Sequence, residues 1–394
     1  MWYTMLIAGV VLVSVCSAQS LPPKEASAFS VRQIHSGHSL TDPLFYPHWP
    51  GQYVNLMGHV LMQPAWQLLN TTVGKSTIPG SSMLYRWDTP PGFGSPDARH
   101  DISSWELLII TERVPLLVEG GSTQAWYIEG IGEQREGLLR FVNNAWLNGN
   151  GGNGAPTLLW TTWVHVDGSS GNFREMLDVQ GAEWERMQDH VNERRVQGSP
   201  PVYLIPGHRM MARLFDDVAR GVVPGVTSID QFFDDAIHTN ELGAYAIALM
   251  HYACIFNRSP VGLPYLLLPD APPGTLTPSP ELAAYLQDMV WDVVTSYPRT
   301  GVSVATGLPV TSQSQRVAVY PNPATLSATV QAQPHCHADI TVVVYDVQGV
   351  VVQRALLEYE GGESAIDVSR VPRGMYLVEI TGCGESRTVP LFVQ

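Results

Sequence analysis

Apolar residues between positions 29 and 297 form short runs that alternate with longer stretches of helical period. This alternation predicts an α/β domain with three layers, in which helices cover both faces of a parallel sheet. The predicted strands are 29–34, 73–78, 107–111, 157–164 and 202–205. The predicted helices are 53–69, 125–147, 182–196, 208–220 and 240–256, followed by a last helix that begins at Pro280. A doubly wound sheet of this kind places its site at the carboxyl ends of the strands.

The apolar period changes to two after residue 316, with turn residues between the runs. Short runs at 317–323, 340–346, 350–356, 366–368 and 374–380 predict a small antiparallel β-sandwich. The segment 301–316 is rich in Gly, Ser, Thr and Gln and has no period, which is typical of a linker. We therefore predict domains at 19–300 and 317–394.

The chain has 394 residues, of which 45% are hydrophobic and 15% charged, so it can bury a sizeable core. A formal net charge of -14 argues against a nucleic-acid or anionic-membrane partner. We expect a monomer. Residues 1–18 carry no charge and end in Cys16-Ser17-Ala18, which predicts a signal peptide, with a short membrane anchor as the alternative.

Three cysteines remain after residue 18. Cys254 lies in an apolar helical run and is expected to be a buried thiol. Cys336 and Cys383 both lie in the C-terminal domain and could pair in an oxidising compartment. The run His335-Cys336-His337 alternates faces in a strand, so we expect neither a metal nor a cofactor.

A candidate nucleophile, Ser39, follows a glycine at the end of the first apolar run, in Gly37-His38-Ser39-Leu40. A serine needs an exposed turn and a nearby base to react. Downstream, Asp235 precedes His238 by three residues at the mouth of an apolar helix. This spacing lets Asp235 accept a hydrogen bond from His238 Nδ1 while Nε2 faces Ser39.

Taken together, Gly37-His38-Ser39-Leu40 and Asp235-x-x-His238 resemble the SGNH (GDSL) hydrolase superfamily over about residues 29–297. The resemblance implies a flavodoxin-like fold and a serine esterase with Ser39, Asp235 and His238 as its catalytic residues. His38 departs from the superfamily, which has aspartate there.

The resemblance also implies an oxyanion hole. Backbone N–H groups of Ser39 or Leu40 and of Gly80, in Ile78-Pro79-Gly80-Ser81, would hold the oxyanion. The superfamily's asparagine after the third strand is absent, and Thr111-Glu112 stands there instead. Thr111 is the candidate replacement donor.

Two further residues follow predicted strand ends or lie on them. Glu112 comes directly after the third strand and Trp163 lies near the end of the fourth. We therefore expect both to contribute to substrate binding, with a core position as the alternative for Trp163.

Three stretches of the C-terminal segment, Tyr320-Pro321-Asn322-Pro323, Tyr345-Asp346-x-x-Gly349 and Gly374-Met375-Tyr376-Leu377-Val378, resemble the type IX secretion C-terminal sorting domain of Bacteroidetes-type bacteria. The resemblance implies export to the cell surface or the medium, with the type IX secretion machinery as a partner. A carbohydrate-binding module is the alternative, but the aromatic residues are too scattered for a stacking face.

The favoured function is an exported serine esterase, with an ester substrate such as an acylated carbohydrate, which would make it a carbohydrate O-deacetylase. The alternative is a surface-displayed binding protein that kept the fold and lost catalysis. The joint presence of serine, aspartate and histidine favours the enzyme.

Overall fold

The computed structural model describes residues 21–28, 31–45, 73–118, 130–263, 265, 274–303, 318–320, 324–331, 339–346, 350–358, 363–382 and 385–393. The predicted signal peptide, the helix at 53–69, most of the linker and the Cys336–Cys383 pair lie outside these residues. No helix in the described part is long and apolar enough to cross a membrane.

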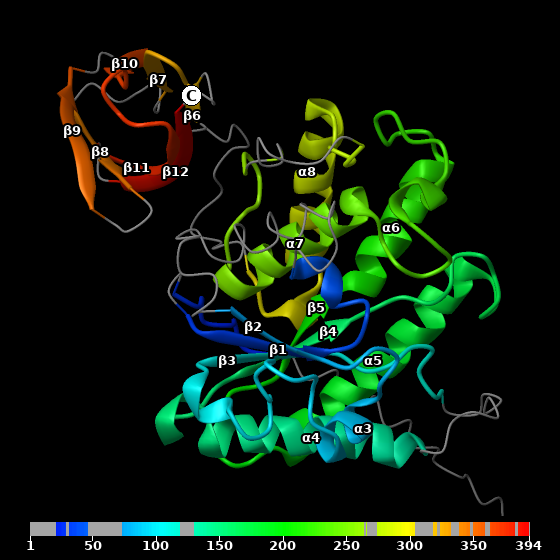
Figure 1. Ribbon diagram of the computed structural model, residues 1–394. Coiled ribbons are helices and arrows are strands. Elements are labelled where there is room, and N and C mark those ends of the chain that lie inside the picture. The colour runs from blue at the N-terminus through cyan, green and yellow to red at the C-terminus, as the bar shows by residue number, and fades with distance from the viewer. Residues whose placement is uncertain are drawn as a thin grey trace, which may run out of the picture.

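The first domain is built on a five-stranded sheet of order β2-β1-β3-β4-β5, in which all neighbours are parallel (Figure 1). Its strands are β1 (Gln33–Gly37), β2 (Val73–Thr77), β3 (Leu107–Ile110), β4 (Thr157–Thr161) and β5 (Tyr203–Pro206). Since parallel strands all end at the same edge, the segments after them gather there.

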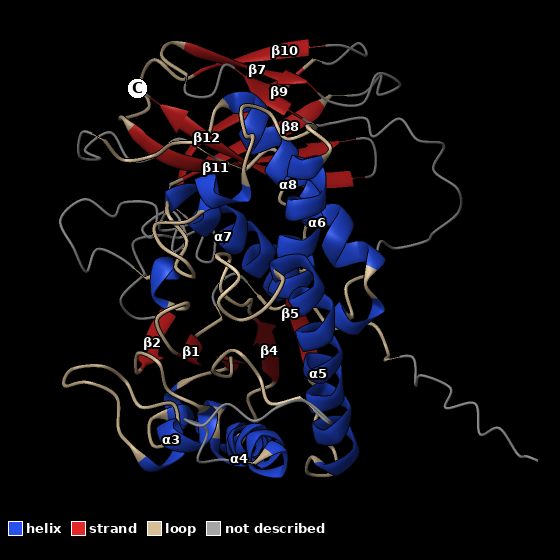
Figure 2. Ribbon diagram, turned by 90° about the vertical axis from the view of Figure 1, so that its right-hand side faces the viewer, coloured by secondary structure: helices blue, strands red, loops and turns tan. Residues whose placement is uncertain are grey.

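Helices cover both faces of this sheet (Figures 1 and 2). One face carries α3 (Met83–Asp88), α4 (Ile131–Asn148) and α5 (Phe173–Arg194), and the other carries α6 (Gly207–Ala219), α7 (Glu241–Phe256) and α8 (Pro280–Ser296). Short 3-10 helices are η1 (Asp42–Leu44), η3 (Ile102–Ser104), η4 (Asn150–Gly152), η5 (Ile229–Phe232) and η6 (Pro298–Thr300).

The alternation of side chains along the strands divides the core in two. On β3, Leu107 and Ile109 pack with α7 and α8, while Leu108 and Ile110 pack with α4 and α5. Full burial of an aliphatic side chain stabilises the fold by about 1.5–3 kcal/mol. The three-layer α/β architecture that the sequence predicts is therefore observed.

The bounds of β1 differ from the predicted 29–34, because polar residues continue into the sheet. His35 Nε2 lies 3.0 Å from Gln33 Oε1, and Ser36 Oγ accepts a hydrogen bond from Arg86 Nε at 3.2 Å. These internal partners let polar side chains occupy a buried strand, which the apolar pattern does not reveal.

Two helices also differ from prediction. α5 begins nine residues before the predicted 182, because Asn172 caps it by accepting a hydrogen bond from Glu175 N. α3 was not predicted; Ser82 caps it by accepting from Tyr85 N. In both cases the capping residue is the sequence feature that could have predicted where the helix begins. Cys254 is fully buried on α7, as predicted.

The C-terminal segment forms two antiparallel sheets that share one core. One sheet has the order β10-β7-β6 and the other β12-β11-β8-β9. The strands are β6 (Ala318–Tyr320), β7 (Ser327–Gln331), β8 (Ile340–Tyr345), β9 (Val351–Leu357), β10 (Glu363–Asp367), β11 (Gly374–Gly382) and β12 (Glu385–Val393). Val330 of the first sheet and Val342 and Val378 of the second belong to the same buried cluster.

Limited proteolysis is expected to cut the chain first between Gly301 and Arg316, because that stretch lacks an apolar period on which a packed structure could form. Mass spectrometry of the early fragments should give one piece ending, and one beginning, in this stretch. Earlier cleavage within 130–263 would contradict the predicted boundary.

Candidate active site

Ser39 lies on a turn that directly follows β1. Thr41 N donates to His38 O at 2.8 Å and Asp42 N donates to Ser39 O at 3.2 Å, and η1 continues the turn. Asp42 Oδ1 accepts hydrogen bonds from Lys75 Nζ and Thr77 Oγ1, each at 2.9 Å. The turn is thus fastened to β2, and Ser39 remains partly exposed.

Asp235 and His238 lie on a short loop before α7. Asp234 N donates to His238 O at 2.9 Å, which closes the loop. Within it, Asp235 Oδ1 accepts from the backbone N–H groups of Ile237 at 2.8 Å and His238 at 2.7 Å. This side-chain turn holds the carboxylate beside the histidine three residues later.

The structure brings Ser39, His238 and Asp235 together. His238 Nδ1 lies 2.7 Å from Asp235 Oδ2, and His238 Nε2 lies 2.8 Å from Ser39 Oγ. Because the carboxylate only accepts, Nδ1 carries the proton and Nε2 accepts from the serine hydroxyl. The two halves of this chain of hydrogen bonds are 199 residues apart in sequence.

The site opens to solvent and carries a fixed negative charge. The side chains of His238 and Asp235 are 40% and 56% exposed. Partial burial raises the pKa of Asp235, but hydrogen bonds from the N–H groups of His238 and Ile237 and from the imidazole outweigh it and lower that pKa to about 2. Asp235 is therefore ionised at neutral pH and can stabilise an imidazolium on His238.

Two backbone N–H groups at this edge are available to an incoming oxygen. Gly80 follows β2, is exposed, and has φ +65, a conformation that L side chains rarely adopt. No atom lies within 4 Å of where a Cβ would stand. Within the described residues, the N–H groups of Ser39 and Gly80 have no hydrogen-bond partner.

Thr111 and Leu40, which were predicted as oxyanion donors, are engaged elsewhere. Thr111 is fully buried; its N–H donates to Ser36 O at 3.1 Å and its hydroxyl donates to Glu112 O at 3.4 Å. Leu40 N–H donates to His38 Nδ1 at 3.4 Å. The structure thus offers neither residue to an oxyanion, because β1–β3 pairing and the His38 ring already use their donors.

Glu112 and Trp163, which were predicted to bind substrate, are both buried, at 2% and 0% exposure. Both Glu112 carboxylate oxygens accept from Met83 N at the start of α3, at 3.1 and 3.0 Å, so the side chain serves a helix end. Trp163 lies in the core, and its indole Nε1–H donates to Ile237 O at 2.9 Å. A position at a strand end therefore did not give either side chain access to substrate.

His38, which directly precedes Ser39, is a buried neutral residue. Its Nε2–H donates to Glu112 O at 2.9 Å. Burial and the neighbouring Arg86 cation lower the pKa of His38 to about 3. His38 therefore links the turn that carries Ser39 to the end of β3.

Arg86 is a buried residue that the sequence analysis missed. Its guanidinium donates to Ser36 Oγ, to Ser81 O at 2.7 Å and to Thr111 O. It thereby joins the ends of β1 and β3 to the loop that carries Gly80. Recognition of α3 from its Ser82 cap would have placed Arg86 on the helix that begins at this edge.

A second serine–histidine pair lies beyond the end of β4. Ser170 Oγ and His165 Nδ1 are 2.8 Å apart. No carboxylate of the described residues bonds to His165. This pair therefore lacks the third group that orients a base.

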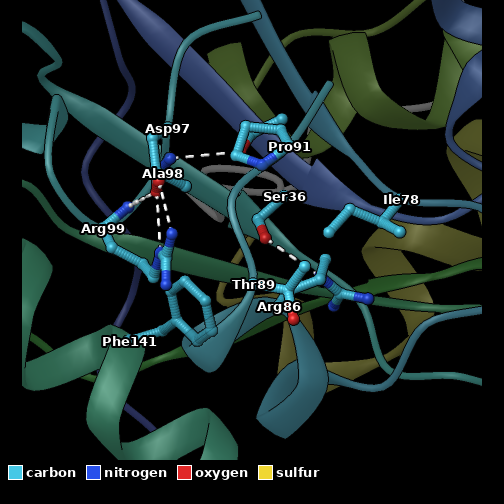
Figure 3. Close-up of a pocket in the computed structure, with 10 residues that line it drawn as sticks. Ser36, Ile78, Arg86, Thr89, Pro91, Asp97, Ala98, Arg99 and Phe141 are labelled. Atoms are coloured by element: carbon cyan, nitrogen blue, oxygen red, sulfur yellow. Dashed lines mark hydrogen bonds and ion pairs between the residues drawn. The ribbon is translucent and has the colours of Figure 1, made fainter. Parts of the chain in front are cut away.

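A small cavity on the side of the sheet that carries α3 and α4 is separate from the triad. It is lined by residues that include Ser36, Arg86, Asp97 and Arg99 and has room for about one water molecule (Figure 3). It does not include Ser39, Asp235 or His238. The described residues also contain no group of three or more His, Cys, Asp or Glu side chains that could hold a metal ion.

Comparison with known proteins identifies the C-terminal domain. Residues 318–394 match the family model of the secretion system C-terminal sorting domain. The protein is therefore exported to the cell surface or the medium, and this domain implies an interaction with the type IX secretion machinery. No curated protein matches the chain.

Solved structures resemble the chain only remotely. A DUF3244 family protein with an immunoglobulin-like β-sandwich fold from Bacteroides vulgatus is 22% identical, with 19% of this chain and 81% of that chain covered and a TM-score of 0.17. An engineered protein is 11% identical, with 92% and 93% covered and a TM-score of 0.25. A double mutant of the Cellulomonas fimi endo-β-1,4-mannanase is 13% identical, with 93% and 94% covered and a TM-score of 0.23. Scores this low support no argument about fold or function.

Proposed function

We propose that residues 19–300 form a serine ester hydrolase of the SGNH type, with a flavodoxin-like fold, which the sorting domain delivers to the outside of the cell. One observation carries this proposal. Ser39 Oγ, His238 Nε2, His238 Nδ1 and Asp235 Oδ2 form an unbroken chain with separations of 2.8 and 2.7 Å. Such a chain is what activation of a serine requires.

In the proposed reaction His238 Nε2 takes the Ser39 proton while Oγ attacks the ester carbonyl carbon. Asp235 holds the imidazolium that forms. The same proton then passes from His238 to the departing alcohol, which leaves an acyl group on Ser39. Water, deprotonated by His238, releases the acid and restores the serine.

The backbone N–H groups of Ser39 and Gly80 would stabilise the oxyanion. Without the superfamily's asparagine, and with Thr111 and Leu40 engaged, the hole has two donors. Removal of one oxyanion donor typically costs about 10²–10³ in kcat. We therefore propose modest turnover, with activated aryl esters cleaved faster than esters of sugar hydroxyl groups.

The exposed position of the triad favours an ester group that is presented on a larger molecule. His238 and Asp235 are 40% and 56% exposed, and the small cavity of Figure 3 lies apart from them. An acylated carbohydrate outside the cell fits this geometry, because its ester can approach an open surface. The proposed activity is accordingly that of a carbohydrate O-deacetylase.

An ester panel on the purified chain tests the function. We expect hydrolysis of p-nitrophenyl acetate to exceed that of the octanoate, and release of acetate from acetylated xylan, with both activities lost after treatment with a fluorophosphonate. A folded protein that hydrolyses no ester and resists the fluorophosphonate would instead support a binding protein displayed at the surface. The two-donor hole is the feature that favours this second candidate.

A further inference from the structure

The loop that carries His238 is attached to the body of the domain by few hydrogen bonds, together with the packing of Ile237 against the core. Apart from the bond to Ser39, two hydrogen bonds join residues 234–238 to the rest of the described chain. Trp163 Nε1–H donates to Ile237 O at 2.9 Å, and Val166 N–H donates to Ala236 O at 2.7 Å. Both donors lie on the segment that follows β4, so these two bonds tie the loop to the end of β4.

Trp163 is the side-chain half of this attachment. Its ring is fully buried and contacts two other rings edge-on, with centroid distances of 6.2 Å to Trp160 and 6.3 Å to Phe233. Phe233 forms a bridge with Thr239 at the base of the same loop. The indole therefore packs against Trp160 in the core. It also contacts the loop at two places, the Phe233 ring at its base and the Ile237 carbonyl near its tip.

The carbonyl that Trp163 binds belongs to the peptide group that leads into His238. Fixing this peptide plane fixes the position of the His238 backbone nitrogen and limits where its Cα and side chain can lie. Apart from the bond that Val166 N–H donates to Ala236 O, the loop's other hydrogen bonds are internal: Asp235 Oδ1 accepts from the N–H groups of Ile237 and His238, and Asp234 N donates to His238 O. They preserve its shape without setting its distance from Ser39.

We propose that Trp163 is a positioning residue that holds His238 at hydrogen-bond distance from Ser39 through its bond to the Ile237 carbonyl. This inference rests on the proposed function. A catalytic group displaced by about 1 Å can cost about 10²-fold in rate. The contribution of Trp163 therefore appears in kcat and not in substrate affinity.

The test is Trp163→Phe, which removes the indole donor and keeps an aromatic ring. We expect kcat for p-nitrophenyl acetate and the rate of fluorophosphonate labelling to fall about 10- to 100-fold, with KM unchanged within about twofold. Hydrogen–deuterium exchange of the peptide covering 233–240 should become faster. That second measurement does not depend on catalysis.

Trp184→Phe is the matched control. Trp184 is also fully buried, but its indole N–H has no hydrogen-bond partner within the described residues. This variant should keep kcat, labelling and exchange of 233–240 near wild-type values while losing a comparable part of an indole from the core. Equal effects of the two variants on kcat and on exchange would overturn the positioning role. If the wild type hydrolyses nothing, the proposed function fails, and the exchange of 233–240 in the two variants still decides whether Trp163 holds the loop.

Discussion

Ser39→Ala is expected to lower ester hydrolysis by about 10⁴-fold or more and to abolish fluorophosphonate labelling, and His238→Ala should do the same. Without Oγ there is no nucleophile, and without the imidazole the serine keeps its proton. Both side chains are partly exposed, so their loss should leave the fold intact. The rates are measured on purified variants, with circular dichroism to establish that they are folded.

Asp235→Asn should cost less than loss of Ser39 or His238, on the order of 10³–10⁴-fold. The asparagine carbonyl can still accept from the N–H groups of Ile237 and His238, so the loop keeps its shape. Its amide, however, donates toward His238 Nδ1 and favours the tautomer whose Nε2–H points at Ser39. That tautomer cannot take the serine proton.

Ser170→Ala is the matched control for this series, because Ser170 Oγ also lies 2.8 Å from a histidine nitrogen. It should retain wild-type rates. If Ser170→Ala abolishes hydrolysis while Ser39→Ala does not, the nucleophile is misassigned. Full activity in Ser39→Ala, with Ser170 also dispensable, would reject the proposed mechanism altogether.

Stability is expected to fall steeply as the pH drops from about 6.5 toward 4. Burial lowers the pKa of His208 to about 3, of His251 to about 4 and, together with Arg86, of His38 to about 3. In the unfolded chain these rings titrate near about 6.5. Between these values the unfolded state binds protons that the folded state does not, so acid favours unfolding.

Each such histidine contributes up to about 1.4 kcal/mol per pH unit, and three together about 4 kcal/mol per pH unit. This is a large part of the 5–15 kcal/mol of typical total stability. Burial raises the pKa of the Asp234 and Glu241 carboxyl groups, which opposes this trend, because just above the ordinary carboxyl pKa the folded state holds protons that the unfolded state has lost. The free energy of unfolding should therefore still rise as the pH rises through this range.

Guanidinium denaturation at a series of pH values measures this slope. His251→Leu removes one buried imidazole whose Nδ1–H bonds only its own helix, at Ile247 O, and should reduce the slope by about one third. Replacement of the exposed His100 by glutamine should leave it unchanged. A free energy of unfolding that is flat between pH 6.5 and 5 would show that the buried rings do not titrate as described.

Local patterns were sufficient for the architecture. Strand periods and helix periods are set by each element's own geometry, so the five parallel strands and most of the later antiparallel strands could be predicted from spacing alone, whereas β7 and β12 were missed. Helix caps are local in the same way: Asn240 caps α7 and Ser279 caps α8, at the helix starts that the sequence predicts. The sorting domain was also recognisable, because its motifs are contiguous short strings that the match at 318–394 covers.

The candidate site was predictable where its residues are close together in sequence. It was not predictable where a residue's role depends on hydrogen-bond partners that are distant in sequence. Asp235 and His238 are three residues apart, and one turn brings them together. Thr111 and Glu112, by contrast, stand at the right strand end, yet hydrogen bonds to Ser36 and Met83 take up their polar groups. Whether a polar group is free for substrate depends on residues far away in sequence.

The sequence by itself therefore determined most of the elements and their order, the export signal and the identities of the candidate triad. Only the tertiary structure decided that Ser39 meets His238, that Trp163 supports the loop from the core, and that Arg86 joins the ends of β1 and β3 to the loop that carries Gly80. Backbone periodicity is a property of neighbouring residues. The distance between side chains on different strands is decided by how the packed sheet brings those strands together.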